Sequence, residues 1–158
     1  MSTKPIMTFI IKVNPEDVTE FMAPMGGGAC FIPFGGWAES ELFSGKIRPG
    51  ACDVQTVNKA GFRKMFAQYI FEGVDQAGQN CHIYVKNETY FDPAAQPGDA
   101  FYAEPTFITD SQALAPYLHT ARFKSKGHGV DPETVCIEIF DLWDTEQDRI
   151  ERKDNIEK

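Results

Sequence analysis

Short apolar runs separated by turn residues fill most of this chain. The runs are rich in β-branched and aromatic residues, and turn sequences such as Asn58-Lys59-Ala60-Gly61 and Asp75-Gln76-Ala77-Gly78 divide them. This pattern predicts consecutive antiparallel hairpins. The expected strands are 5–13, 29–34, 37–47, 53–57, 62–72, 79–91, 100–108, 120–126 and 134–143.

The segments between these runs carry little helical periodicity. Residues 14–24 are acidic and turn-like, residues 92–99 and 127–132 are rich in Pro, Gly and Asp, and 110–118 fits one helical turn capped by Asp110 or Ser111. Many short strands with so little helix favour an all-β closed barrel or a sandwich over an α/β fold. A closed barrel also removes the edge strands that such an apolar set would expose.

The chain divides into one folded domain and a charged tail. Residues 1–143 are expected to form the β domain, whereas ten of the fifteen residues in 144–158 are charged. The tail is expected to be a short solvated helix or disordered. At 158 residues, with 42% hydrophobic and 13% aromatic residues, the chain is long enough to bury a sizeable core.

Charge and cysteine usage limit the partners and the compartment. The net charge is −8 with no visible basic patch, which argues against nucleic acid and anionic membranes as partners. The N-terminus lacks the apolar core of a signal peptide, and no apolar run approaches the ~20 residues that span a bilayer. We therefore expect a cytoplasmic protein in which Cys30, Cys52, Cys81 and Cys136 are reduced thiols.

Motifs for cofactors and metals are missing from the sequence. Gly26-Gly27-Gly28 and Gly35-Gly36 do not fit a dinucleotide fingerprint, and Gly45-Lys46 lacks the rest of a phosphate loop. His82, His119 and His128 have no partner at metal-ligand spacing. We expect neither a cofactor nor a metal.

The order of glycines, prolines and aromatic residues resembles a known family. The chain is similar to the family called domain of unknown function 3237 over roughly residues 5–143. The resemblance implies a single antiparallel β-barrel with a lipocalin-like interior and no established activity, and the strand pattern predicts about eight to ten strands. The motifs are Gly35-Gly36-x-x-Glu39, Gly45-x-Ile47-x-Pro49-Gly50-x-x-Asp53, Ala67-x-Tyr69, Asp75-x-x-Gly78, Ile83-x-Val85-x-Asn87 and Phe101-Tyr102-x-x-Pro105-x-Phe107-x-Thr109. Phe66, Gln68, Val54 and Ala103 stand where that family usually has Asp, Arg, Trp and Arg, so the ligand of this chain is expected to be more apolar.

Two carboxylates are the candidate catalytic residues. Glu39 and Asp53 flank a glycine-rich hairpin, and both fall on positions of the family pattern. An acid at the mouth of an apolar barrel has its pKa raised by desolvation, which suits general acid–base work. The alternative is that Asp53 only braces the Pro49-Gly50 turn through backbone hydrogen bonds.

Six further residues are candidate ligand-binding groups. Alternation places Gln68 between Phe66 and Ile70, where its amide would point into an apolar cavity or else pair across strands. The other candidates are polar or aromatic side chains on the expected strands, each with core packing or solvation as its alternative. The full set is Gln68, Tyr69, Asn87, Glu104, Tyr102 and Trp37.

These candidates support three hypotheses. The leading one is a small-molecule-binding barrel that acts as a cofactor-independent acid–base enzyme of the isomerase, cyclase or lyase type on a mostly apolar organic ligand. The second is a carrier or sensor barrel without chemistry. The third is a structural subunit of a homo-oligomer that assembles through one aromatic face.

Overall fold

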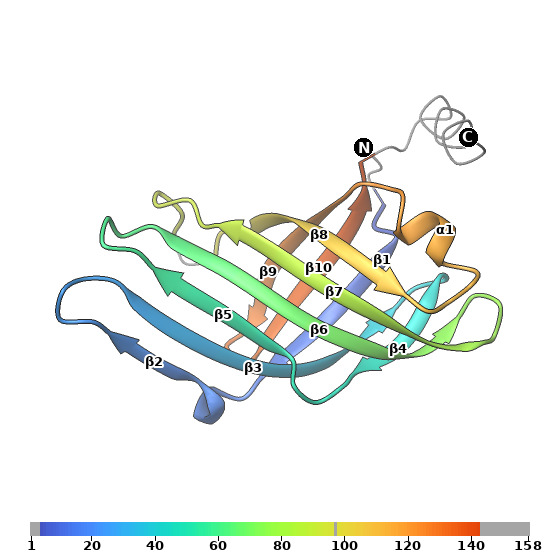
Figure 1. Ribbon diagram of the computed structural model, residues 1–158, viewed down its shortest axis with the longest axis horizontal. Coiled ribbons are helices and arrows are strands. Elements are labelled where there is room, and N and C mark those ends of the chain that lie inside the picture. Colours follow the sequence, from blue (N-terminus) through green and yellow to red (C-terminus); the bar gives the residue numbers. More distant parts are fainter. Residues whose placement is uncertain (1–3, 97, 143–158) are drawn as a thin grey trace.

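A computed structural model describes residues 4–96 and 98–142, which form an antiparallel β-barrel (Figure 1). The expected tail 144–158 lies outside the described residues. The elements are β1 Met7–Val13, a 3₁₀ turn Pro15–Asp17, β2 Thr19–Met22, β3 Gly28–Glu39, β4 Phe43–Ile47, β5 Cys52–Val57, β6 Arg63–Asp75, β7 Asn80–Tyr90, β8 Phe101–Thr109, α1 Ala115–Leu118, β9 Phe123–Asp131 and β10 Thr134–Asp141.

Eight of these strands close into a ring. The pairing runs β1, β10, β9, β8, β7, β6, β4 and β3, and β3 pairs back with β1. This confirms the expected all-β barrel. Strands β2 and β5 are additional: β5 lies between β3 and β6 beyond the end of β4, and β2 pairs with β3 beyond the end of β1. With the long strands β3 and β6 they extend the sheet past the barrel on one side (Figure 1).

Strand β3 is longer than the sequence pattern predicted. The runs 29–34 and 37–39 were expected to be separate, but Gly35 and Gly36 continue one strand. Gly36 adopts a φ of +136°, and a Cβ there would lie 1.9 Å from the Ile10 carbonyl oxygen on β1. The glycines therefore let β3 pass close to β1, which closes the barrel instead of ending the strand.

Three other boundaries also differ from the prediction. The expected strand 37–47 is broken after Glu39, because the Ser40 hydroxyl accepts hydrogen bonds from the Leu42 and Phe43 amides in a tight turn. Strand β2 lies within the segment expected to be a turn. Strand β9 continues to Asp131, through most of the loop expected at 127–132, because these residues pair with β10.

One end of the barrel is filled by a large apolar core. The inward-facing side chains include Phe9, Phe71, Ile83 and Ile139, all essentially inaccessible to water. Burying a side chain of this size contributes about 1.5–3 kcal/mol. Leu118 of the short helix α1 joins the same cluster, so the helix covers this end.

All four cysteines are free, as expected. Burial raises the pKa of each thiol, so the thiolate form that reacts with oxidants is disfavoured. Among the described residues, no helix is both long and apolar enough to cross a membrane.

The close approach of β3 to β1 is testable with two adjacent glycines. Gly36→Ala should lower the free energy of unfolding by more than about 3 kcal/mol, because the new methyl group meets the Ile10 carbonyl in a backbone conformation that disfavours side chains. Gly35→Ala is the control, since a Cβ at Gly35 has no atom within 4 Å. Urea denaturation of both variants measures the difference, and equal stability of the two would contradict this account of closure.

Candidate functional site

The register between β5, β6 and β7 places a carboxylate inside the protein. Asp53 on β5 pairs with Ala67 on β6, and Ala67 pairs with Asn87 on β7. Directly paired residues point to the same side of a sheet, and Ala67 and Asn87 are buried on the inner side. Asp53 and Asn87 therefore face the interior with only a methyl group between them.

A chain of polar contacts leads from Asp53 to the surface. Gln55 Nε2 donates to Asp53 Oδ2 at 2.8 Å, and Arg63 Nη1 donates to Gln55 Oε1 at 3.1 Å. Arg63 Nη2 lies 3.7 Å from Glu20 Oε1, at side chains that are 36% and 54% exposed. The contacts fix the orientation of the Gln55 amide, because its oxygen faces a cation and its nitrogen faces the carboxylate. Gln55 and Arg63 were not among the predicted site residues.

Two buried oxygen atoms in this region have no hydrogen-bond partner. Within the described part of the chain, Asp53 Oδ1 and the Tyr69 hydroxyl are the buried side-chain polar atoms left unpaired. Tyr69 lies two residues beyond Ala67 on the same face of β6. It is therefore a diagonal cross-strand neighbour of Asp53, a position at which residues are typically about 7 Å apart. Unpaired buried polar atoms are rare in folded proteins and call for a partner.

The surroundings shift the pKa of both groups. Burial is the largest influence on Asp53 and raises the pKa of its carboxyl, while the Gln55 amide, the Arg63 guanidinium and the Phe66 backbone N–H oppose the shift. The Phe66 N–H lowers the pKa of Asp53 but makes no hydrogen bond to Oδ1. Burial, and then the nearby Asp53 charge, raise the pKa of Tyr69 far above its ordinary value, so this phenol stays protonated.

Aromatic rings surround Tyr69. Its ring makes edge-to-face contacts with Phe9, Phe34 and Phe71 at centroid distances of 6.2, 5.1 and 5.5 Å. Tyr69 is 4% exposed, so its position is fixed by packing on several sides. The site thus combines two polar groups with an apolar, aromatic wall.

Asn87 is held by a second inward-facing polar residue. Asn87 is 1% exposed, and the Ser125 hydroxyl lies within donating distance of Asn87 Oδ1 at 3.1 Å and of the Ala103 carbonyl oxygen at 3.3 Å. Asn87 and Tyr69 both face the interior of the barrel. Their role in binding stays a prediction.

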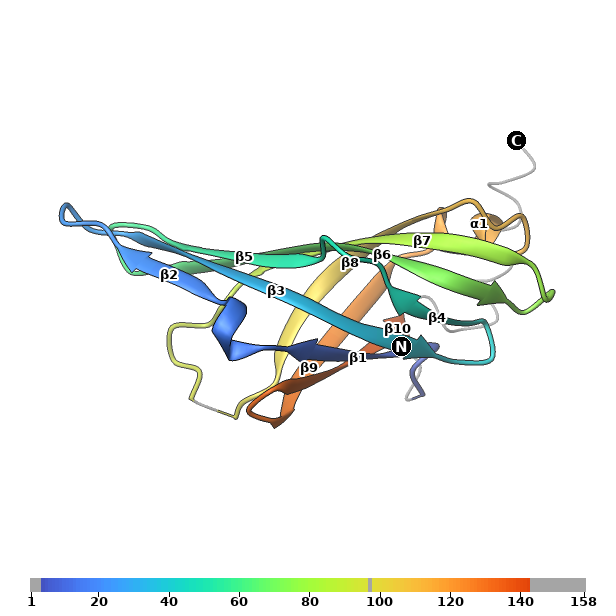
Figure 2. The same cartoon turned by 90° about the horizontal axis from the view of Figure 1, so that it is seen from below.

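A groove adjoins the inner side at the same end of the barrel. It has a volume of about 710 Å³ and begins at Thr89, two residues beyond Asn87 on the same face of β7. Phe91 and Phe101, which contact each other at 5.9 Å, form part of its wall. Figure 2 shows the extension made by β2, β3 and β5 on one side of this end and the connection between β7 and β8 on the other.

Five predicted site residues lie on the outer surface, away from Asp53. Glu39 is exposed, belongs to the outward set of β3, and lies seven residues, or about 23 Å, along that strand from the partner of Asp53. Glu39 and Asp53 therefore do not lie together, so the expectation that both carboxylates act as catalytic residues at one barrel mouth is wrong. Four predicted ligand-binding residues also point outward and do not contact Asp53: Gln68, which accepts from the Tyr84 hydroxyl, Glu104, which contacts Arg122, half-buried Trp37, and Tyr102, which packs against Lys124 and also lines the groove that begins at Thr89.

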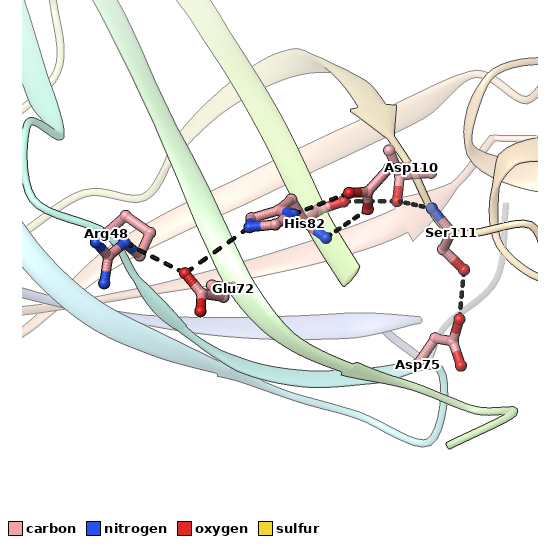
Figure 3. A network of polar contacts seen from close by, with 7 residues as sticks. Arg48, Glu72, Asp75, His82, Asp110 and Ser111 are labelled. Carbon is pink, nitrogen blue, oxygen red and sulfur yellow. Dashed lines mark hydrogen bonds and ion pairs between the residues drawn. The ribbon is translucent and has the colours of Figure 1, made fainter. Parts of the chain in front are cut away.

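A second polar cluster lies on the outside of the barrel (Figure 3). His82 Nδ1 is 2.9 Å from Asp110 Oδ2, and His82 Nε2 is 3.8 Å from Glu72, which also contacts Arg48 at 3.3 Å. Deeper in the same region, the Ser111 hydroxyl donates to Asp75 at 2.6 Å. These contacts tie the segment before α1 to β6 and β7, which gives them a structural role in closing the filled end.

The outer cluster borders a groove of about 450 Å³ lined in part by Arg48, Glu72, His82 and Tyr84. Arg48, Glu72 and His82 on this groove contact one another, whereas the hydroxyl of Tyr69, a residue that also lines the groove, has no hydrogen-bond partner. Among residues 4–96 and 98–142, no three His, Cys, Asp or Glu side chains gather as a metal ion would require. The inner site is therefore the stronger candidate for function.

Comparison with known proteins identifies the fold. No family model and no curated protein matches the chain, so the family resemblance stays a prediction. Solved structures do match it: a protein of unknown function from Clostridium acetobutylicum (22% identity, TM-score 0.68, 87% of this chain and 94% of that one) and a conserved protein of unknown function from Rhodopseudomonas palustris (23%, 0.69, 89% and 96%). A third is a β-barrel-like protein from Acinetobacter baumannii (20%, 0.69, 87% and 93%). At these identities the similarity establishes the barrel fold alone.

The raised pKa of Asp53 predicts how stability depends on pH. Because the folded state disfavours the Asp53 carboxylate, the unfolded chain ionises first as pH rises from about 4, and stability falls until the folded-state pKa is passed. Asp53→Asn removes this loss. The free energy of unfolding of the variant, relative to the unmodified protein, should therefore increase between pH 4 and pH 7 in urea titrations.

Asp17→Asn provides the control, because Asp17 is an exposed residue of the 3₁₀ turn and undergoes the same chemical change. The increase for Asp53→Asn should exceed any change seen for Asp17→Asn, which controls for the loss of one surface carboxylate. A flat profile for Asp53→Asn would show that burial does not raise the pKa of this carboxyl.

Proposed function

We propose that the protein binds a mostly apolar small organic molecule at the open end of the barrel and performs cofactor-independent acid–base chemistry on it. The observation that carries the proposal is the pair of buried, unpaired oxygens, Asp53 Oδ1 and the Tyr69 hydroxyl, on one inward face. A ligand that supplies the missing hydrogen bonds would remove the cost of burying them, about 1–3 kcal/mol for each group.

Asp53 has the properties of a proton carrier. Its raised pKa makes the carboxylate a stronger base than a solvated aspartate, and one oxygen is held by Gln55 while the other is free to react. Burial of a catalytic acid in an apolar site is a common way to bring its pKa toward neutrality.

The walls of the site favour an apolar ligand. Phe9, Phe34 and Phe71 pack around Tyr69, and Met65 lies next to Ala67 on the inner face of β6. Ligand pockets typically combine such apolar walls with a few convergent polar groups. Asp53, Tyr69 and Asn87 would provide the polar part.

Access to the site requires side chains to move. Both unpaired oxygens are covered. Between Asp53 and the open end of the barrel lie three long, unbranched side chains on the same face, Gln55, Met65 and Arg63. Side chains of this kind change rotamer easily, and methionine adapts its shape to what it contacts. Rotation of Met65 and Gln55 toward the groove at Thr89 would open a route for the ligand.

Binding is testable with the neutral fluorescent probe N-phenyl-1-naphthylamine. The unmodified protein should enhance its fluorescence saturably, and Ala67→Leu should weaken binding by about tenfold or more, because the larger side chain fills the space between Asp53 and Asn87. The matched control is Gln68→Leu, the adjacent outward-facing residue, which should bind as the unmodified protein does.

Overpacking at Ala67 also costs about 1–3 kcal/mol of stability, so circular dichroism melts must show that the variant is folded under the assay conditions. Equal weakening by both leucine variants, or no saturable binding by the unmodified protein, would contradict the proposed site. Binding that persists with no turnover of any acid–base substrate would indicate a carrier.

A further inference from the structure

We infer that the ligand of this site is an enolisable carbonyl compound, with Asp53 taking a proton from the carbon next to the carbonyl and Tyr69 donating a hydrogen bond to the carbonyl oxygen. This inference rests on the proposed function and names its substrate class. It assigns a separate role to each unpaired oxygen. The argument starts from Tyr69, whose surroundings allow fewer roles.

Tyr69 can donate a hydrogen bond but is a poor proton carrier. The ring is enclosed by Phe9, Phe34 and Phe71, so the hydroxyl is held in place without a partner of its own. Burial keeps the phenol protonated. A fixed, neutral O–H in an apolar site stabilises an oxygen on which negative charge develops, as in an oxyanion hole.

Asp53 is placed to act on an atom near that oxygen. It is the diagonal neighbour of Tyr69 on the same inward face, and its unpaired Oδ1 is the free acceptor of the carboxylate. In an enolisable ketone the acidic C–H is two bonds from the carbonyl oxygen. One molecule can therefore present its oxygen to Tyr69 and its C–H bond to Asp53.

The reaction balances without any co-reactant. The C–H bond breaks, its proton passes to Asp53 Oδ1, and the electron pair forms a carbon–carbon double bond as the carbonyl π electrons move onto oxygen. The enolate oxygen accepts the Tyr69 hydrogen bond. In a β,γ-unsaturated ketone, return of the proton from Asp53 to the γ-carbon yields the conjugated isomer and regenerates the carboxylate.

The charges around the site disfavour an anionic ligand. Asp53 would repel a carboxylate or phosphate, and Arg63, four residues before Ala67 on the same face of β6, is already in contact with Gln55 and Glu20. A neutral carbonyl compound avoids this repulsion in the ground state. Its charge appears only on the enolate oxygen, at Tyr69, once Asp53 has been neutralised by the proton.

A pair of planar probes tests the role of Tyr69. 2-Naphthol carries an oxygen that resembles that of an enolate, and naphthalene is the same ring system without it. Fluorescence titration should show that the unmodified protein prefers 2-naphthol over naphthalene by about fivefold or more, the value of one net hydrogen bond. Tyr69→Phe should abolish the preference while naphthalene affinity stays within about twofold.

Two further variants sharpen the binding test. Tyr84→Phe removes a hydroxyl from the outer face, where it contacts Gln68, and should keep the preference. Asp53→Asn should also keep it, because the naphthol oxygen is assigned to Tyr69. Loss of the preference in Asp53→Asn with retention in Tyr69→Phe would overturn the assignment of roles.

Isomerisation of 3-cyclohexen-1-one to the conjugated 2-cyclohexen-1-one, followed by absorbance, tests the chemistry. The unmodified protein and Tyr84→Phe should accelerate it over buffer. Asp53→Asn should reduce that acceleration by about 100-fold or more, as expected for loss of a general base, and Tyr69→Phe by about 100-fold, as expected for loss of an oxyanion donor. Acceleration that survives either change, or none by the unmodified protein, would overturn the inference.

Failure of this inference and failure of the proposed function give different results. If N-phenyl-1-naphthylamine binds and responds to Ala67→Leu but 2-naphthol shows no preference over naphthalene, the binding site stands and the carbonyl substrate is wrong. If neither probe binds saturably, the proposed function itself is wrong. Circular dichroism melts of Tyr69→Phe and Asp53→Asn verify that both variants are folded.

Discussion

The pairing register of β5 with β6 determines which chemistry this barrel can hold inside. With Asp53 opposite Ala67, a carboxylate faces the same interior as Tyr69. A slip of one residue would turn Cys52 inward in its place and move Asp53 to the surface, because successive side chains of a strand alternate between faces. The register is fixed from both sides of β5, since β3 pairs with it along its whole length. The candidate site therefore depends on the same backbone hydrogen bonds that hold the extension to the barrel.

Burial of the apolar core offsets the free-energy cost of the unpaired oxygens in the inner site. Two buried oxygens without partners destabilise the fold by several kcal/mol together, on the order of the burial energy of two core side chains. The apolar cluster around Phe9, Phe71 and Ile139 includes Leu118 of α1 at one end and extends as far as Tyr69 and Ala67. The packing that stabilises the barrel therefore also holds Tyr69 in place and offsets the cost of its unpaired hydroxyl, as in proteins that keep strained or unsatisfied groups for function.

Alternation along the strands made part of the site predictable. Period-two patterning separated the two faces of β6 and β7, and the turn residues marked most strand ends, but the pattern alone left open which face of β6 points inward. Gln68 and Tyr69 are adjacent on one strand and cannot both point inward, and the aromatic packing around Tyr69 decided between them. Glu39 was misplaced because proximity to a glycine turn says nothing about which face a side chain occupies. Gln55 was not predicted as a site residue, because its orientation depends on a hydrogen bond from Arg63 on the neighbouring strand, which the sequence alone does not reveal.

The path from Asp53 to water bears on the type of reaction the site favours. Hydrogen bonds link the Asp53 carboxylate to the surface through Gln55 and Arg63. Neither an amide nor a guanidinium group readily releases a proton near neutral pH. The Gln55 and Arg63 contacts can stabilise charge on Asp53 Oδ2, but they cannot carry a proton to solvent. A proton taken up on Oδ1 faces the ligand and the covered interior. In the proposed reaction, the proton therefore leaves the carboxyl by returning to the ligand at a different carbon. Among the acid–base reactions open to an aspartate, that constraint favours isomerisation over elimination, because elimination must also deliver a proton to a departing group.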